Sequence, residues 1–177
     1  MQRTMPPPRE IDDSLIHDSL IQMDAARTIH SPWLGDVESD AQCELLFPAG
    51  LPGFEEERRM VPVEIPAQRP LVYLQSVERA EICFVALPVY VIDPAFQLLI
   101  SDEERSILDL PEDCDPVIGA DVLCLALLMP SGRSVQANTH ASIVINLHNR
   151  RGVQCVPADG LSSRFRVLDE SGWTTLC

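Results

Sequence analysis

The amino-acid sequence predicts a mainly β protein: an antiparallel β-barrel-like single domain with one or two short helices. Two observations lead to this fold class. From Gln42 onward, short runs rich in apolar and β-branched residues are separated by Pro and Gly, which is the pattern of strands joined by turns. These runs follow one another at near-regular spacing, and such spacing is typical of antiparallel sandwiches and barrels.

Each of these runs is a predicted strand, and in chain order they are Cys43–Phe47, Arg59–Ile65, Leu71–Val77, Ile82–Leu87, Gly119–Met129, Ala141–His148, Val153–Pro157 and Arg164–Leu168. One helix is predicted at Ser101–Leu110, because Ser101 can cap its first turn and Glu104 completes a capping box. The segments 130–132 and 149–152 are predicted hairpin turns.

The chain is expected to divide into three parts. Residues 1–41 are predicted to be an N-terminal extension, mobile or helical, because three consecutive prolines open it and Asp12 to Arg27 has only a weak helical pattern. Residues 42–170 are the predicted β-barrel domain. Residues 171–177 are the predicted C-terminal tail.

Charge limits the classes of partner. The chain has 27 acidic residues against 13 basic ones, a net charge of −14, and every basic residue is arginine. A protein that binds nucleic acid or anionic lipid needs a basic surface, so both are disfavoured. A basic protein partner is favoured instead, although an acidic surface also serves solubility alone.

The negative charge is unevenly distributed. Residues 44–121 hold sixteen acids and five arginines, a net charge of −11. Residues 122–177 hold three acids and five arginines, a net charge of +2. We therefore expect the acidic face to come from the N-terminal two-thirds.

The lack of a membrane-spanning run and of a signal-peptide pattern predicts a cytoplasmic protein. The longest apolar run, Val122 to Met129, is too short to span a bilayer, and the N-terminus lacks the apolar core of a signal peptide. In the cytoplasm the six cysteines are expected to be reduced thiols, and no C-x-x-C occurs. Four of them lie in apolar runs and are predicted to be buried, namely Cys43, Cys83, Cys124 and Cys155.

No catalytic, metal or cofactor site is predicted. The sequence has no phosphate-binding loop, dinucleotide fingerprint, nucleophile elbow or zinc motif. Clusters of adjacent acids, such as Glu55 to Glu57, are expected to be solvated. Two alternatives to a binding protein stay open: a small hydrolase that uses His140 or His148, and a small-molecule-binding β-barrel.

Two segments suggest protein recognition. The first, Phe47–Glu55, sets two phenylalanines around a rigid turn; Phe47 is expected to fill the core, while Leu51 or Phe54 is presented to a partner. The second, Asn138–Asn146, is an apolar strand between asparagines that are expected to satisfy backbone groups. It leads into Arg150 and Arg151, candidates for contacting a carboxylate.

In this order, the two segments resemble the FliW family of flagellar assembly factors. The family's F-x-x-G-L-P-G-F-E signature is matched by Phe47 and Gly50–Glu55, and its aromatic-L-Q-S segment by Tyr73–Ser76. Its last motif is matched by Asn138, Ala141, Ile143–Asn146, Arg150 and Gln154. Thr139 and Ser142 replace a leucine and a proline of the family pattern, and residues 1–40 have no counterpart in it.

The resemblance implies a non-enzymatic β-barrel-like protein without cofactors, a monomer when free, with two protein partners. One is flagellin, and the other is the carbon storage regulator CsrA, a small basic protein that represses translation of flagellin mRNA. Binding of the regulator would relieve repression until flagellin displaces it. The candidate partner-binding residues are Leu51, Phe54, Glu55, Glu56, Asn138, Asn146, Arg150, Arg151 and Gln154.

Overall fold

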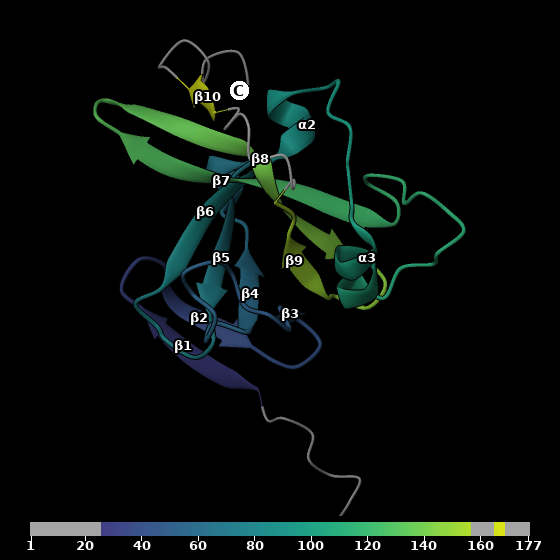
Figure 1. Ribbon diagram of the computed structural model, residues 1–177. Coiled ribbons are helices and arrows are strands. Elements are labelled where there is room, and N and C mark those ends of the chain that lie inside the picture. The colour runs from purple at the N-terminus through teal and green to yellow at the C-terminus, as the bar shows by residue number, and fades with distance from the viewer. Residues whose placement is uncertain (1–25, 157–164, 169–177) are drawn as a thin grey trace, which may run out of the picture.

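One antiparallel sheet makes up most of the protein (Figure 1). The structure, a computed structural model, describes residues 26–156 and 165–168. The strand order is β10-β8-β7-β6-β5-β4-β3, and β9 pairs with β8. The strands are β3 Leu45–Leu46, β4 Arg59–Val63, β5 Val72–Ser76, β6 Cys83–Pro88, β7 Val122–Ser131, β8 Ser134–Asn146, β9 Gly152–Gln154 and β10 Phe165–Leu168.

A single bridge brings the ends of this sheet together. Leu46 of β3 forms a parallel bridge with Arg151, which directly precedes β9, and the Leu46 N–H donates to the carbonyl of Arg150 at 2.9 Å. Because β3 and β9 lie at the two ends of the curled sheet, this contact nearly closes it. The predicted β-barrel-like fold is confirmed.

Two apolar layers lie on the two faces of the sheet. Within β7, Leu125 joins one buried cluster, whereas Val122, Cys124 and Ala126 join the other, as the alternation of side chains along a strand requires. The first cluster fills the barrel, and its buried members are Leu45, Phe47, Leu51, Met60, Val72, Leu74, Ala86, Leu125, Ile143 and Ile145. The second lies beneath the helices α2 Val89–Ile92 and α3 Asp102–Leu108.

A change of register divides the β7–β8 pair. Leu125 pairs with Ile143, but Leu127 pairs with Asn138, so four residues of β8 stand opposite Ala126 alone. Beyond this bulge the two strands continue as an arm that leaves the barrel and carries β10 on its outer edge (Figure 1). Bulges bend and twist a strand in this way.

The N-terminal extension is partly a β-hairpin. β1 Arg27–Ser31 pairs with β2 Gly35–Ser39 in a separate two-stranded sheet. Ile29 and Val37 pack on Val61 of β4. The expectation of a mobile or helical segment is therefore wrong for Arg27–Ser39, because alternating residues of these strands are buried against the barrel. Residues 1–25 and the tail 171–177 lie outside the described residues, and the domain boundaries stay predictions.

The other predicted elements are largely found. All the predicted strands are present, and the helix α3 has the predicted capping box between Ser101 and Glu104. The short helix α2 and a 3₁₀ turn at Pro66–Gln68 were not predicted. β8 begins at Ser134 rather than Ala141, because the arm continues the pairing past the bulge. Within the described residues, no helix is both long and apolar enough to cross a bilayer.

The cysteine predictions hold in part. Cys124 and Cys155 are buried, and Cys83 is half-buried. Cys43 is exposed, so its predicted burial is wrong. The reason is local: Asp40 Oδ1 accepts hydrogen bonds from the backbone N–H groups of Gln42 and Cys43, which makes residues 40–43 a turn and leaves β3 only two residues long.

Candidate functional site

The two signature segments meet where the barrel closes. The Phe47 ring lies so close to Gly152 that a Cβ there would come within 2.5 Å of it, and Leu46 is bridged to Arg151. Phe47 is fully buried, as expected. Residues about one hundred positions apart in the chain thus form one surface, which is the candidate functional site.

Most of the Phe47–Glu55 loop is tightly folded. Leu51 and Phe54 exchange backbone hydrogen bonds, and Gly50 has φ +69° with its Cα facing the backbone of Glu55. A Cβ at Gly50 would lie 2.5 Å from Glu55 Cα, so a side chain has no room there. Leu51 is 1% exposed and belongs to the core.

Three of the predicted contact residues in and directly after this loop are exposed. Phe54 is 37% exposed and packs edge-on against Phe84, with 4.9 Å between ring centroids. Glu55 and Glu56 are exposed. The Gly53 N–H donates to Glu55 Oε1 at 2.9 Å, and this bond lowers the pKa of the Glu55 carboxyl below its usual value. Among the predicted contact residues of the loop, these three are accessible.

Glu57 is buried, although the acidic run was expected to be solvated. Its carboxylate accepts hydrogen bonds from the Ser76 hydroxyl and from Arg79 Nε. Ser76 ends β5 and Arg79 lies in the turn between β5 and β6, so Glu57 attaches the loop to the start of that turn. A buried carboxylate is tolerated only when it is paired in this way.

The N-terminal hairpin is attached to the same turn. Ser31 Oγ donates to Gln75 Oε1 at 2.6 Å, and the amide of the fully buried Gln75 donates to the carbonyls of Ser76, Ala80 and Ile82. The Trp33 Nε1–H donates to the carbonyl of Glu81 at 2.9 Å. This explains the Leu74-Gln75-Ser76 motif: both polar side chains organise one turn.

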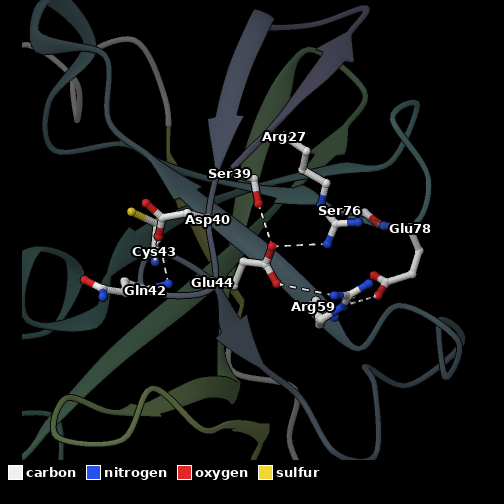
Figure 2. Close-up of polar contacts among 9 residues, drawn as sticks. All are labelled: Arg27, Ser39, Asp40, Gln42, Cys43, Glu44, Arg59, Ser76 and Glu78. Carbon is white, nitrogen blue, oxygen red and sulfur yellow. Dashed lines mark hydrogen bonds and ion pairs between the residues drawn. The ribbon is translucent and has the colours of Figure 1, made fainter. Parts of the chain in front are cut away.

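Glu44 holds the other end of the hairpin (Figure 2). Its Oε1 accepts from Ser39 Oγ at 2.6 Å and from Arg27 Nη2 at 3.2 Å. Its Oε2 lies 3.7 Å from Arg59 Nη1, and Arg59 Nε in turn pairs with Glu78 at 3.0 Å. Glu44, which directly precedes β3, is therefore a nearly buried carboxylate whose contacts connect β3 with β2 and β4.

The asparagines and Arg151 of the last motif serve the fold. Asn138 Oδ1 accepts from the N–H groups of His140 and Ala141 inside the bulge, as expected for a backbone-satisfying role. Asn146 Nδ2 and Asn149 Nδ2 both donate to the carbonyl of Leu108, and Arg151 Nε donates to that of Ile107 at 2.6 Å.

These contacts cap the C-terminus of α3. The last carbonyls of a helix have no partner within it, and a cation near them is favourable. At the other end of the helix, Glu104 Oε1 accepts from the Val156 N–H at 3.2 Å. The side chains of Asn146 and Arg151 thus bind the end of the helix. The side chain of Gln154 binds within the sheet, because its Nε2 donates to the carbonyl of Ala141.

Arg150 is the exposed arginine of this turn and has φ +61°. Its charge acts on Asp40, whose carboxyl pKa is lowered mainly by hydrogen bonds from the Cys43 thiol and the Gln42 N–H and also by Arg150. The same thiol contact raises the pKa of Cys43. Arg150 therefore lies at the edge of the barrel seam, the line where β3 meets the turn before β9, and faces the turn that precedes β3.

An acidic groove runs along α3. It has a volume of about 450 Å³ and is lined by Asp102, Arg105, Ser106, Asp109, Leu110 and Glu112. Arg105 Nη1 donates to the carbonyls of Pro111 and Cys114, both at 2.8 Å, and so orders the acidic loop behind the helix. The groove is polar and open, and its three carboxylates, Asp102, Asp109 and Glu112, belong to the predicted acidic face of residues 44–121.

The residues considered for catalysis do not form a cluster. His148 Nε2 lies 3.3 Å from Asp121 Oδ1 at the surface, whereas His140 is half-buried in β8. The pKa of Asp121 is lowered, first by the Val117 N–H and then by His148. In the part of the chain that the structure describes, no three His, Cys, Asp or Glu side chains are placed to hold a metal ion.

In the described part of the chain, one space for a small molecule lies outside the barrel. The barrel interior is filled by the buried cluster around Phe47 and Leu74. An apolar recess of about 270 Å³ lies between α2 and the start of β7, and it is lined by Val89, Tyr90, Asp93, Pro94, Phe96, Ile118, Gly119 and Leu123.

Sequence reasoning missed Trp33, Glu44, Glu57 and Gln75. For Trp33 a signal existed: an apolar residue between polar ones, Ile29 and Val37, stands on each side of Pro32-Trp33-Leu34-Gly35, which is the pattern of a short hairpin. Glu44, Glu57 and Gln75 each bind at least one partner that is 17 or more positions away in the chain. The local sequence therefore holds no comparable signal for their roles.

Comparisons with known proteins agree with the geometry. The sequence profile of the family described as FliW protein matches residues 28–167. The match begins within β1, so the expectation that residues 1–40 have no counterpart in the family is wrong for residues 28–40. The flagellar assembly factor FliW of Oceanobacillus iheyensis is 34% identical over 128 residues, which cover 72% of this chain and 84% of that protein. The corresponding protein of Azoarcus sp. is 33% identical over 130 residues, covering 72% and 89%.

A solved structure has the same fold. The crystal structure of a flagellar assembly factor FliW superimposes with a TM-score of 0.66 at 25% sequence identity, covering 81% of this chain and 95% of that one. The profile match spans most of the sequence, and both signature segments lie within it. The chain therefore belongs to the FliW family of flagellar assembly factors.

Proposed function

We propose that this protein is a non-enzymatic, cytoplasmic flagellar assembly factor that works by exchanging protein partners. It binds the carbon storage regulator and so relieves repression of flagellin mRNA translation, and flagellin displaces the regulator. The observation that carries the proposal is the surface at the barrel seam. There the two signature segments converge, with Phe54, Glu55, Glu56 and Arg150 exposed around a rigid loop.

Rigidity supports a binding role. The loop is fixed by the Leu51–Phe54 bridge and by Glu57, so little conformational entropy is lost when a partner docks on it. Partner exchange requires reversible complexes, with dissociation constants of roughly nM to μM. An interface of about 800 Å² per partner is sufficient for such affinities.

The direct test is binding to the two purified partners. The chain is mixed with flagellin, with the regulator, and with both, and complexes are resolved by pull-down and size-exclusion chromatography. We expect a complex with each partner at micromolar concentration and loss of the regulator when flagellin is added. Absence of both complexes would rule out the proposal, and a stable ternary complex would rule out the exchange.

The acidic face of residues 44–121 is proposed to meet the basic regulator. Opposite charges steer association, and salt screens them over a Debye length of about 10 Å at 0.1 M. The association rate constant measured by stopped flow is therefore expected to fall severalfold between 50 and about 300 mM salt. A rate constant that does not change with salt would contradict electrostatic steering while leaving the complex itself in place.

A further inference from the structure

Trp33 is a large aromatic side chain that the fold leaves in solvent. It lies in the turn of the β1–β2 hairpin and is 69% exposed. An exposed indole that serves no structural purpose is usually free to change rotamer. Here its ring N–H is fixed on the carbonyl of Glu81 at 2.9 Å, so the ring is exposed and held at the same time.

The backbone beneath the ring is fixed as well. The N–H groups of Trp33 and Leu34 both lie 3.3 Å from Ser31 Oγ, and that hydroxyl donates to the buried Gln75. Leu34 packs against the cluster of Ile29, Val37 and Val61. Two independent anchors therefore hold the indole in place, and a partner that contacts it loses little entropy in ordering it.

Two exposed acidic residues adjoin Trp33: Glu81 contacts it through its backbone carbonyl, and Asp36 lies three positions further along the chain. Glu81, whose carbonyl holds the indole, is exposed, and among the described residues no cation pairs with its carboxylate. Asp36 follows the hairpin turn and is likewise exposed, with His30 as its hydrogen-bond partner. The arginine on the same turn as Glu81 is Arg79, which is committed to the buried Glu57.

A tryptophan face next to carboxylates suits a cationic side chain. Tryptophan is the best cation–π acceptor among the side chains, and arginine stacks on aromatic faces. Phosphate groups would be repelled, which excludes nucleic acid and anionic lipid at this point. Tryptophan is also enriched among the few residues that contribute most to protein–protein affinity.

We propose that Trp33, flanked by Glu81 and Asp36, receives an arginine or lysine side chain of a basic protein partner. The β1–β2 hairpin is then a docking element rather than a passive extension. It is continuous with the candidate site, because Glu81 and Arg79 lie on the same turn. Glu81 binds Trp33, and Arg79 binds Glu57, which follows the Phe47–Glu55 loop. The inference rests on the proposed function in one respect: the carbon storage regulator is taken as the basic partner.

The test measures affinity for the purified regulator by titration calorimetry with the full chain. Trp33→Ala is expected to weaken binding at least about tenfold, and Trp33→Leu to behave like Trp33→Ala, because leucine keeps apolar bulk but has no π face. Trp33→Phe is expected to stay within about threefold of the original. The matched control is Met129→Ala, since Met129 is 38% exposed on β7 and lies outside residues 44–121.

The outcomes separate the inference from the proposed function. If the unmodified chain does not bind the regulator, the proposed function fails for that partner. If it binds and Trp33→Ala binds equally well, or if Met129→Ala is weakened as much, the docking inference is overturned. If Trp33→Leu binds like the original chain, the contact is apolar and the cationic part is overturned.

A double variant tests the inference independently of whether Trp33→Ala folds. The double variant Asp36→Asn, Glu81→Gln changes only exposed carboxylates, and its melting temperature is expected to stay within a few degrees of the original. It is expected to bind the regulator about three- to tenfold more weakly, with a smaller dependence on salt. Unchanged affinity and unchanged salt dependence would overturn the inference.

Discussion

Buried polar side chains hold the candidate site together at the scale of residues. Gln75, Ser76 and Glu57 are all fully buried, and each makes hydrogen bonds to the turn between β5 and β6 or to the segments attached to it. Removing a buried polar group leaves its former partners unsatisfied, which destabilises more than the lost bond itself. These residues therefore fix the shape of a surface that they do not themselves form.

Glu57→Ala tests this role. It is expected to lower the free energy of unfolding by about 2–4 kcal/mol, because Ser76 loses its buried acceptor and Arg79 loses its partner. Urea denaturation followed by circular dichroism measures the change. The control is Glu56→Ala at the exposed neighbouring position, which is expected to stay within about 0.5 kcal/mol of the original. Equal stability of the two variants would refute a special role for Glu57.

At the scale of elements, α3 depends on the turn that precedes β9. A seven-residue helix is too short to be stable alone. Its N-terminus has its own capping box, but its C-terminus relies on Asn146, Asn149 and Arg151. The same turn contacts β3 through Leu46, so the acidic groove and the Phe47–Glu55 loop are both built on it.

Asn146→Ala should loosen that attachment. The variant removes a donor to the Leu108 carbonyl and the acceptor of the His148 N–H, and we expect a loss of about 1–3 kcal/mol in the free energy of unfolding. Hydrogen exchange of the α3 amides should quicken more than that of β5 and β6. Arg150→Ala, at the exposed position of the turn, is the control. Exchange that rises equally everywhere would contradict a local clamp.

At the scale of the molecule, two apolar layers share one sheet. The layer inside the barrel and the layer beneath the helices are separated only by the thickness of β7, β8 and β9. Cys124 and Cys155 lie in the outer layer, where burial raises the thiol pKa of Cys124 to about 12 and that of Cys155 further. Cys43 and Cys114 are exposed.

Cysteine alkylation therefore reports on the whole fold. At neutral pH we expect iodoacetamide to modify Cys43 and Cys114 first in the native protein, and Cys124 and Cys155 only through unfolding. Mass spectrometry of timed samples at increasing urea concentration gives the rate at each site. If Cys124 or Cys155 reacted as fast as Cys43 without denaturant, the packing of the outer layer would be contradicted.

The sequence by itself determined the local features. Runs of β-branched residues between Pro and Gly specify the strands, and Ser101 with Glu104 specifies the start of α3, because these signals act within a few residues. The order of the two signature segments was sufficient to identify the family. The sequence also placed the candidate contact residues Phe54, Glu55, Glu56 and Arg150 in or beside predicted turns, but it did not separate them from their buried neighbours.

Only the tertiary structure decided which of the remaining residues are inside. Arg151 caps Ile107, 44 positions away, and Glu57 meets Arg79 across 22 positions, so no local pattern distinguishes Arg151 from Arg150 or Glu57 from Glu56. The anchor of the exposed Trp33 is equally distant in the chain, because Glu81 is 48 positions away. The physical reason is that burial of a polar side chain depends on a partner, and these partners come together only when the barrel closes.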